Sequence, residues 1–237
     1  MQLILLSAGR GSRLSQSLRK KPKSLAKIND KSILEHNINF FNKFKKKYII
    51  TGFKGNLIKN FAKKYNFKRI HNINYKSTNM VYSTFLSTKY IKEDVVVCYG
   101  DIIFDSSIYE ILKERKNIIP LNKNWLSLWK KRMKKNKIIK DAENVEIKKN
   151  ILKSIGGKIE TKLPKYQYMG IFKLKKESFL KLSYFFKKIR DKKIDMTTFL
   201  NESIRKKQVK FNIKTYSKIW FEIDNFKDIK VASKELN

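Results

Sequence analysis

The chain has 237 residues, enough for one α/β domain, or for one domain with an extra lobe, around a sizeable core. Its 56 lysines and arginines outnumber its 20 aspartates and glutamates, and the formal net charge of +36 would attract nucleic acids and other polyanions. Most of these basic residues are lysines, however, and they are spread along the whole chain rather than gathered into one arm. A specific nucleic-acid partner is therefore not expected, although a basic nucleic-acid-binding protein is kept as a remote alternative.

The apolar residues argue against a membrane-embedded or secreted protein. No apolar run is long enough to cross a membrane as a helix, and the first apolar run is too short for a signal peptide. The one cysteine, Cys98, lies within an apolar run and cannot form an internal disulfide, so we expect a buried structural thiol. The sequence thus predicts a cytoplasmic protein.

A phosphate-binding loop is predicted near the start of the chain. The apolar run 3–6 is short enough for a buried parallel strand, and small residues follow it directly. Small residues after a strand let backbone N–H groups approach a phosphate closely and form an anion-binding concavity. Arg13 and Lys23 would add the positive charges that a triphosphate needs. The predicted nucleotide-binding residues of this loop are Ser7, Ala8, Gly9, Gly11 and Ser12.

This stretch differs from two well-known phosphate loops. A dinucleotide fingerprint needs a glycine where Leu14 stands, and the Gly-Lys-Ser/Thr of a P-loop is absent. The stretch instead resembles the signature of the nucleotidyltransferase superfamily that activates sugar and alcohol phosphates: a strand, L-x-A-G-x-G-x-R-L, a spacer and P-K. The resemblance implies catalytic roles for Arg13 and Lys23. It also implies a single domain over 1–237, with a Rossmann-like core and a small β-rich, acceptor-binding lobe over about 121–170.

Strands and helices alternate in the next part of the chain. Apolar spacing predicts a helix over 32–44 with Ser32 as its N-cap, and a second helix over 56–65. Apolar β-forming runs predict strands over 47–52 and 67–73. This alternation predicts an α/β fold with a mostly parallel, doubly wound sheet.

A polar cluster precedes the helix that is predicted over 80–90. Its members Thr78 and Asn79 would either cap this helix or face a ligand from the helix N-terminus, and the sequence favours neither role. The segment 72–90 resembles the branch of the superfamily that makes CDP-linked small molecules, including the phosphocholine and phosphonate cytidylyltransferases. The resemblance implies that Thr78 and Asn79 lie near the nucleotide.

Two carboxylates at strand ends are the predicted metal ligands. Asp101 follows the apolar run 95–99, at the end of a buried strand where open α/β sheets bind their ligands. A carboxylate there suits Mg²⁺, which takes oxygen ligands and binds triphosphates. The strand predicted within 218–228 ends near Glu222 and Asp224, and the resemblance implies that Asp224 is the second metal-binding residue. We therefore expect Asp101 and Asp224 to converge on one Mg²⁺, the predicted cofactor.

The predicted acceptor-binding residues lie in the second half of the chain. Trp125 and Trp129 are four positions apart, so they share one face of a helix, either as core or beside an ammonium group of a ligand. A hairpin over 145–160 with its turn at Lys149–Asn150, and a strand over 166–174, come next. The pattern around the tryptophans resembles a subgroup of bacterial cytidylyltransferase-like proteins. The candidates are Trp129, Arg132, Asp141, Glu143, Tyr168 and Asp195, of which Asp195 is also a plausible helix cap.

The resemblance implies that a nucleotidyl group moves from an NTP, by resemblance CTP, to a small phosphorylated or phosphonylated acceptor with release of pyrophosphate. An arginine, two carboxylates and an aromatic face within one segment suit an acceptor that carries an amine, such as phosphocholine, aminoethylphosphonate or a phosphorylated amino acid. A sugar-1-phosphate nucleotidyltransferase that uses UTP or dTTP is the alternative. Membrane insertion is not expected, and a homo-oligomer is compatible with the sequence.

Overall fold

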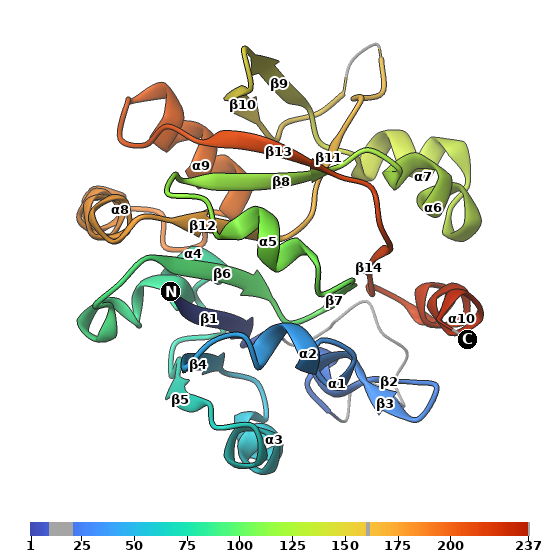
Figure 1. Ribbon diagram of the computed structural model, residues 1–237, viewed down its shortest axis with the longest axis horizontal. Helices are drawn as coiled ribbons and strands as arrows, with labels where there is room; N and C mark the ends of the chain where they lie inside the picture. The colour runs from blue at the N-terminus through green and yellow to red at the C-terminus, as the bar shows by residue number, and fades with distance from the viewer. Residues whose placement is uncertain (10–20, 160–161, 237) are drawn as a thin grey trace.

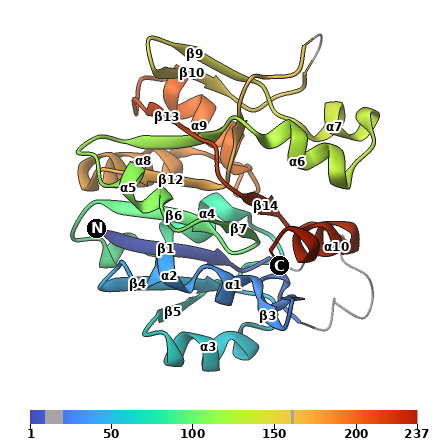
Figure 2. The ribbon, with the colours of Figure 1, turned by 45° about the vertical axis from the view of Figure 1, so that its right-hand side comes forward.

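The computed structural model of the chain describes residues 1–9, 21–159 and 162–236 (Figure 1). A mixed β-sheet runs through the molecule, and helices pack on both of its faces (Figures 1 and 2). This arrangement confirms the predicted α/β fold class with a Rossmann-like core. In spatial order the strands are β5 (Lys68–His71), β4 (Lys46–Thr51), β1 (Gln2–Ser7), β6 (Val95–Tyr99), β12 (Ile171–Leu174), β8 (Ile118–Asn122), β13 (Asn212–Tyr216), β10 (Ile151–Ile155) and β9 (Val145–Lys148), with β11 (Gln167–Tyr168) beside β8.

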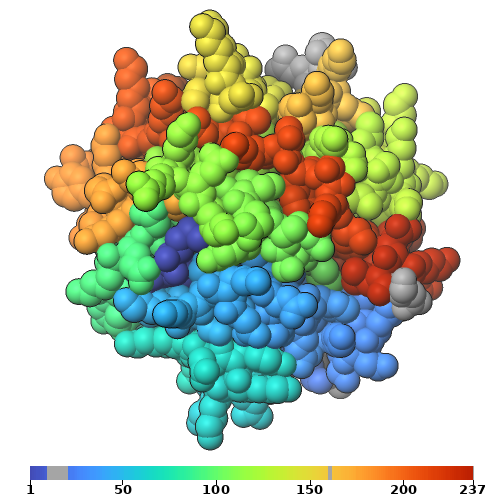
Figure 3. All heavy atoms as spheres, in the orientation of Figure 1, coloured from blue at the N-terminus to red at the C-terminus, as the bar shows by residue number. Residues whose placement is uncertain are grey.

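Both faces of the sheet are buried because its central strands are apolar at successive positions. Leu3 and Leu5 of β1 join one core cluster, whereas Ile4 and Leu6 join another on the opposite face. The helices that pack into the Leu3 cluster are α1 (Ile33–His36), α2 (Ile38–Phe41), α3 (Lys59–Lys64), α5 (Ile108–Leu112), α6 (Trp125–Arg132) and α7 (Lys135–Asp141). Those in the Ile4 cluster are α4 (Met80–Phe85), α8 (Lys176–Lys188) and α9 (Met196–Arg205). In the space-filling view, the blue and green segments that hold α2 and α5 cover the face turned towards the viewer (Figure 3).

The parallel half of the sheet brings two predicted site segments to one edge. β1 pairs in parallel with both β4 and β6, with Ser7 opposite Thr51 and Leu6 opposite Tyr99. The loop after β1 and the turn that holds Asp101 therefore leave the sheet at the same edge. On the other side of β6, β12 pairs antiparallel and begins the mixed half of the sheet.

The C-terminal segment returns to the same edge. β14 (Trp220–Glu222) pairs antiparallel with β7 (Ile102–Phe104), so the residues that follow β14 lie beside those that precede β7. α10 (Phe226–Glu235) then packs against the small hairpin of β2 (Lys27–Ile28) and β3 (Lys31–Ser32), close to the start of the chain (Figure 2). The C-terminal segment is thereby joined both to β7, in the middle of the chain, and to the β2–β3 hairpin near the N-terminus.

Two predicted elements are interrupted. The helix predicted over 32–44 is divided into α1 and α2 at Asn37, a buried residue. Its side chain donates to the backbone oxygen of Ile102 at 2.7 Å and accepts from the backbone N–H of Phe104 at 3.3 Å, so it ties this segment to β7 instead of continuing a helix. The strand predicted over 166–174 is divided at Gly170, whose φ is +74° and where a Cβ would lie 2.7 Å from the Tyr99 ring.

Other predicted elements agree with the structure. Ser32 caps α1, and β9 and β10 form the predicted hairpin, with positive φ at both Lys149 and Asn150 as a tight two-residue turn requires. The helix predicted over 80–90 is shorter: α4 ends at Phe85, and a 3₁₀ turn follows at Thr88–Tyr90. Within the described ranges, no helix combines the length and the apolar character that crossing a membrane would require.

Candidate active site

A lysine held between two carboxylates is the centre of the candidate site. Lys23 Nζ lies 2.7 Å from Asp101 Oδ2 and 2.6 Å from Asp224 Oδ1. Lys23 begins a 3₁₀ turn (Lys23–Leu25), Asp101 follows β6, and Asp224 follows β14, so three chain segments converge. The side chains are mostly buried, with 13% of Lys23 and 11% of Asp224 exposed. The predicted convergence of Asp101 and Asp224 is thus present in the geometry.

A third carboxyl group, that of Glu222, lies close to these residues. Burial, together with the charges of Asp224 and Asp101, raises the pKa of Glu222 to about 8, and the accessible part of its side chain lines a cavity. Burial by itself would lower the pKa of Lys23, but the neighbouring Asp101, Asp224 and Glu222 outweigh it and raise that pKa. Lys23 therefore stays protonated, and we call these four residues the reaction end of the site.

The carboxylates of the reaction end fit a magnesium ion. Asp101 Oδ1 is buried and has no hydrogen-bond partner among the described residues. Mg²⁺ is commonly held by one or two carboxylates, and it completes its shell with water and substrate phosphates. In the described part of the chain, no group of three or more histidines, cysteines or carboxylates forms a metal-binding arrangement by itself. Asp101 and Asp224 therefore suit a Mg²⁺ that depends on a bound triphosphate for further ligands.

A cavity of about 170 Å³ lies beside the loop that follows β1. Thr78 Oγ1 is already engaged, because it accepts from Asn72 at 3.0 Å and donates to the Asn74 backbone oxygen at 2.8 Å. Asn79 caps α4 through the Met80 N–H. Four predicted nucleotide-binding residues line this cavity, namely Ala8, Gly9, Thr78 and Asn79.

The remaining predicted residues of the N-terminal loop are not among the described residues that line this cavity. Ser7 is buried and its hydroxyl pairs with that of Ser24, next to Lys23. Arg13, Gly11 and Ser12 lie outside the described residues.

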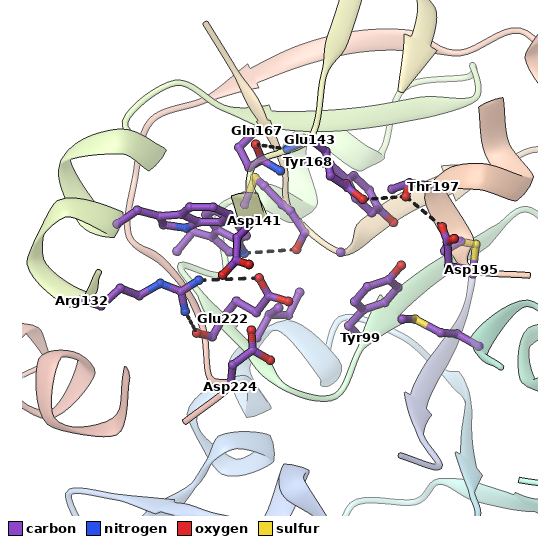
Figure 4. A pocket seen from close by; sticks show the side chains of 17 residues that line it. Tyr99, Arg132, Asp141, Glu143, Gln167, Tyr168, Asp195, Thr197, Glu222 and Asp224 are labelled. Carbon is purple, nitrogen blue, oxygen red and sulfur yellow. Dashed lines mark hydrogen bonds and ion pairs between the residues drawn. The ribbon is translucent and has the colours of Figure 1, made fainter. Parts of the chain in front are cut away.

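A second cavity of about 230 Å³ adjoins the first at Met80 and Tyr99 and contains the predicted acceptor-binding residues (Figure 4). All six of those residues line it, and we call it the acceptor cavity. In a chain with a net charge of +36, five carboxylates at one cavity form a marked local exception. These carboxylates belong to Asp141, Glu143, Asp195, Glu222 and Asp224.

The two predicted residues on α6 have structural partners. The Arg132 guanidinium contacts Asp228 Oδ2 at 3.2 Å, approaches Glu222 Oε2 at 3.9 Å, and lies 4.9 Å from the centre of the Trp129 ring. Trp129 also stacks on Trp220, with ring centres 6.3 Å apart. Arg132 therefore holds the β14 segment in place, and its guanidinium is not free to bind a ligand. Because Trp129 is only 4% exposed, little of its indole is open to an ammonium group.

The opposite side of the acceptor cavity is formed by Glu143, Asp195, Thr197 and Tyr168, which we call its distal end (Figure 4). Thr197 Oγ1 lies 2.7 Å from Glu143 Oε1 and 3.0 Å from Asp195 Oδ1. Asp195 also caps α9 by accepting from the Thr198 N–H, so the structure contains the cap that the sequence offered as one role for this residue.

Some cavity residues were not selected from the sequence. Thr197 lies within Asp-Met-Thr-Thr, a pattern typical of a helix start, so nothing local indicated a cavity. Tyr99 and Trp220 sit in strands whose apolar pattern indicates core. Glu222 was noted at a strand end, and its position two residues before Asp224 was the available signal.

Known proteins that resemble the chain include CTP-dependent transferases. No protein-family model matches it. It is 26% identical over 255 residues, covering 98% of each chain, to the CTP:phosphoglutamine cytidylyltransferase of Campylobacter jejuni subsp. jejuni. It is also 35% identical over 125 residues to the bifunctional protein GlmU of Methanococcus maripaludis, covering 52% of this chain and 30% of that relative.

Solved structures share the fold over nearly the whole chain. The CTP:phosphocholine cytidylyltransferase of Streptococcus pneumoniae superposes with a TM-score of 0.81 at 17% identity, covering 100% of this chain and 99% of the other. The inositol-1-phosphate CTP transferase of T. maritima gives a TM-score of 0.80 at 17% identity, with coverage of 98% and 95%. These similarities confirm the resemblance carried by the N-terminal signature: the chain is similar over its full length to CTP-dependent cytidylyltransferases.

Proposed function

We propose that the protein transfers a cytidylyl group from CTP, with Mg²⁺ as cofactor, to a small phosphorylated or phosphonylated acceptor that carries an amine. The observation that carries this proposal is the position of the acceptor cavity. The cavity is lined by five carboxylates, and one of them, Asp224, pairs with Lys23, which also pairs with Asp101. Such a cavity attracts a cationic group, while the protonated lysine offers a charge to phosphate.

The reaction needs charge neutralisation more than proton transfer. An acceptor phosphate oxygen attacks the α-phosphorus of CTP, the bond from that phosphorus to the bridging oxygen breaks, and pyrophosphate leaves in line. The attacking oxygen is already anionic at neutral pH, so no general base is required. Mg²⁺ held by Asp101 and Asp224 would supply charge neutralisation at the triphosphate.

The proposed site divides its roles among a lysine, an arginine and the nucleotide-binding residues. Lys23 would stabilise the negative charge that develops on the α-phosphate and the leaving pyrophosphate. Arg132 acts through Glu222 and Asp228, and is a positioning residue. Proposed triphosphate and cytidine contacts come from Ser7, Ala8, Gly9, Gly11, Ser12, Arg13, Thr78 and Asn79.

The choice of nucleotide is supported by relatives rather than by geometry. The Campylobacter jejuni relative is named for CTP and phosphoglutamine, and two structural neighbours are named for CTP with phosphocholine or inositol-1-phosphate. CTP is the nucleotide common to these three names. The acceptors differ, so the acceptor must be argued from the cavity.

Pyrophosphate release tests the proposal directly. CTP, UTP and dTTP would each be combined with phosphocholine, aminoethylphosphonate, phosphoglutamine and glucose-1-phosphate, with the Asp224→Asn protein as a control for contaminating activity. We expect release with CTP and at least one amine-bearing acceptor. Efficient use of glucose-1-phosphate with UTP or dTTP, and none of the amine-bearing acceptors with CTP, would instead establish a sugar-1-phosphate nucleotidyltransferase.

A further inference from the structure

At the distal end of the acceptor cavity, oxygen atoms that can accept hydrogen bonds outnumber the groups that can donate them. Thr197 Oγ1 carries one proton, yet it contacts both Glu143 Oε1 and Asp195 Oδ1, so it donates to one carboxylate at a time. Asp195 also accepts from the backbone N–H of Thr198 at 2.8 Å and from its hydroxyl at 2.7 Å. The hydrogen bonds of Asp195 are therefore satisfied, whereas the Glu143 carboxylate accepts a side-chain hydrogen bond from Thr197 alone among the described residues.

A second observation at the same place also indicates a position for a ligand. Tyr168 is only 6% exposed and lines the cavity; its hydroxyl interacts with the Tyr99 side chain but makes no hydrogen bond of good geometry to a described residue. A buried hydroxyl without a partner loses the hydrogen bonds that water would give it. Figure 4 shows Tyr168 beside Glu143, on the side of the cavity opposite Arg132.

The negative charge of the distal end has no basic partner within the part of the chain that the structure describes. Across the described residues, no lysine or arginine forms an ion pair with Glu143 or Asp195, although the chain holds 56 such residues. Burial and the charge of Asp195 raise the pKa of Glu143, as expected for a carboxylate that lacks a cation. A ligand cation would stabilise the ionised form of Glu143.

The two tryptophan rings of the cavity do not offer the alternative, a surface for a methylated cation. The Trp129 ring contacts both the Arg132 guanidinium and the Trp220 ring, and Trp129 and Trp220 are only 4% and 2% exposed. A quaternary ammonium gains mainly from aromatic faces and has no N–H to donate. A primary ammonium has three N–H donors and no acceptor, which complements an oxygen-rich surface.

We propose that the distal end binds a primary ammonium group of the acceptor, through the oxygens of Glu143, Tyr168 and Thr197, and selects against quaternary ammonium groups. This inference rests on the proposed function and specifies its substrate class. The acceptor would lie across the cavity, with its amine at the distal end and its phosphate or phosphonate at the reaction end. Asp195 adds negative charge and fixes Thr197, without a direct hydrogen bond to the ligand.

Matched acceptor pairs test the inference. One pair is phosphoethanolamine and phosphocholine, which differ by three N-methyl groups. The other is phosphoglutamine and its N-acetyl derivative, which lacks the α-ammonium charge. Pyrophosphate release would give kcat and KM for each with CTP, and calorimetry would give binding independently of turnover. The variants are Glu143→Gln, Thr197→Val and Thr197→Ser, with Glu146→Gln on the neighbouring strand β9 as an exposed matched control.

We expect the primary amine of at least one pair to be preferred by about 10-fold or more in kcat/KM. Glu143→Gln should raise the KM for that acceptor about 10- to 100-fold and leave the KM for CTP unchanged. Thr197→Val should also raise the KM for that acceptor. Thr197→Ser should leave this KM close to its original value because it keeps the hydroxyl, and Glu146→Gln should leave it unchanged.

The outcomes separate this inference from the proposed function. Turnover that favours the quaternary or acetylated member of each pair, or that Glu143→Gln leaves unchanged, would overturn the ammonium site while nucleotidyl transfer stands. Calorimetric binding of a primary-amine compound that is lost in Glu143→Gln, without turnover by any acceptor, would support the ammonium site and overturn the proposed reaction. Absence of both binding and turnover for every amine would overturn both.

Discussion

The carboxylates at the two ends of the acceptor cavity have different partners. At the reaction end, protein cations already contact the carboxylates: Lys23 pairs with Asp101 and Asp224, and Arg132 approaches Glu222. At the distal end, Glu143 and Asp195 have only hydroxyl and backbone partners among the described residues. The difference teaches that the charges of the reaction end are already paired within the protein. At the distal end, the carboxylates lack a positive partner among the described residues, and a cationic substrate can supply it.

Removing one carboxylate of the reaction end should have the largest effect on activity. Asp224→Asn, or Asp101→Asn, keeps the side-chain shape but removes a charge that the proposed Mg²⁺ needs, so kcat should fall by about 10³-fold or more. The matched control is Asp30→Asn, an exposed turn residue with φ of +64°, which asparagine tolerates well. Steady-state kinetics at saturating Mg²⁺ measure the effect, and near-normal kcat in either variant would remove that residue from the proposed metal site.

Removing the arginine beside the reaction end should chiefly reduce stability. Arg132 and Asp228 have side chains that are 5% and 1% exposed, so Arg132→Met leaves a buried carboxylate without its cation. The free energy of unfolding should fall by about 3–5 kcal/mol, measured by urea denaturation. Arg205→Met breaks an exposed ion pair with Glu202 and should change it by no more than about 1 kcal/mol. Similar losses in both variants would show that Arg132 is no more important than a surface arginine.

Removing the lysine of the reaction end should reduce the rate of the chemical step. Lys23→Ala should cost about 2–4 kcal/mol of transition-state stabilisation, as loss of a preorganised group beside developing charge does. The expected signature is a lower kcat, in addition to any rise in KM. Lys21→Ala, at an exposed position two residues earlier, is the control. A rise in the KM for CTP with kcat unchanged would mean that Lys23 binds only the ground state.

The smallest effect is expected at the cavity rim. Asp141 lines the acceptor cavity but is exposed at the end of α7, so water screens its charge. Asp141→Asn should therefore change the acceptor KM by no more than about fivefold, less than Glu143→Gln does. Parallel titrations of one acceptor against both variants measure this. Equal effects would mean that exposure does not distinguish the two carboxylates, and that the rim takes part in ammonium binding.

Local sequence patterns were enough to predict some residues of the site. Lys23 belongs to the Pro-Lys pair that ends the N-terminal signature of strand, glycine loop and spacer. Asp101 closely follows an apolar strand. Their placement depends on a parallel strand arrangement, which the apolar runs indicate. The same reasoning placed the strands of the parallel half to within a few residues.

Contacts between distant segments could not be predicted in this way. Arg132 meets Asp228 across 96 positions and Trp129 meets Trp220 across 91, and no local pattern announces such pairings. The sequence alone therefore suggested that the Arg132 guanidinium is available to bind the phosphate of the acceptor. The break at Asn37 has the same cause, because its partners on β7 lie more than 60 positions away.

The origin of the reaction end in three distant segments has a consequence for synthesis of the protein. Lys23 and Asp224 are 201 positions apart, and the strand that delivers Asp224 pairs with β7, which lies between them in the sequence. On the ribosome, the N-terminal strands emerge long before their final partner does. A nascent chain can therefore assemble the nucleotide-facing half of the molecule while it still lacks a complete set of charges. In the proposed mechanism, catalytic competence arrives only once Asp224 has been synthesised and placed, so a product that terminates before this residue would be inert even where much of its core had formed.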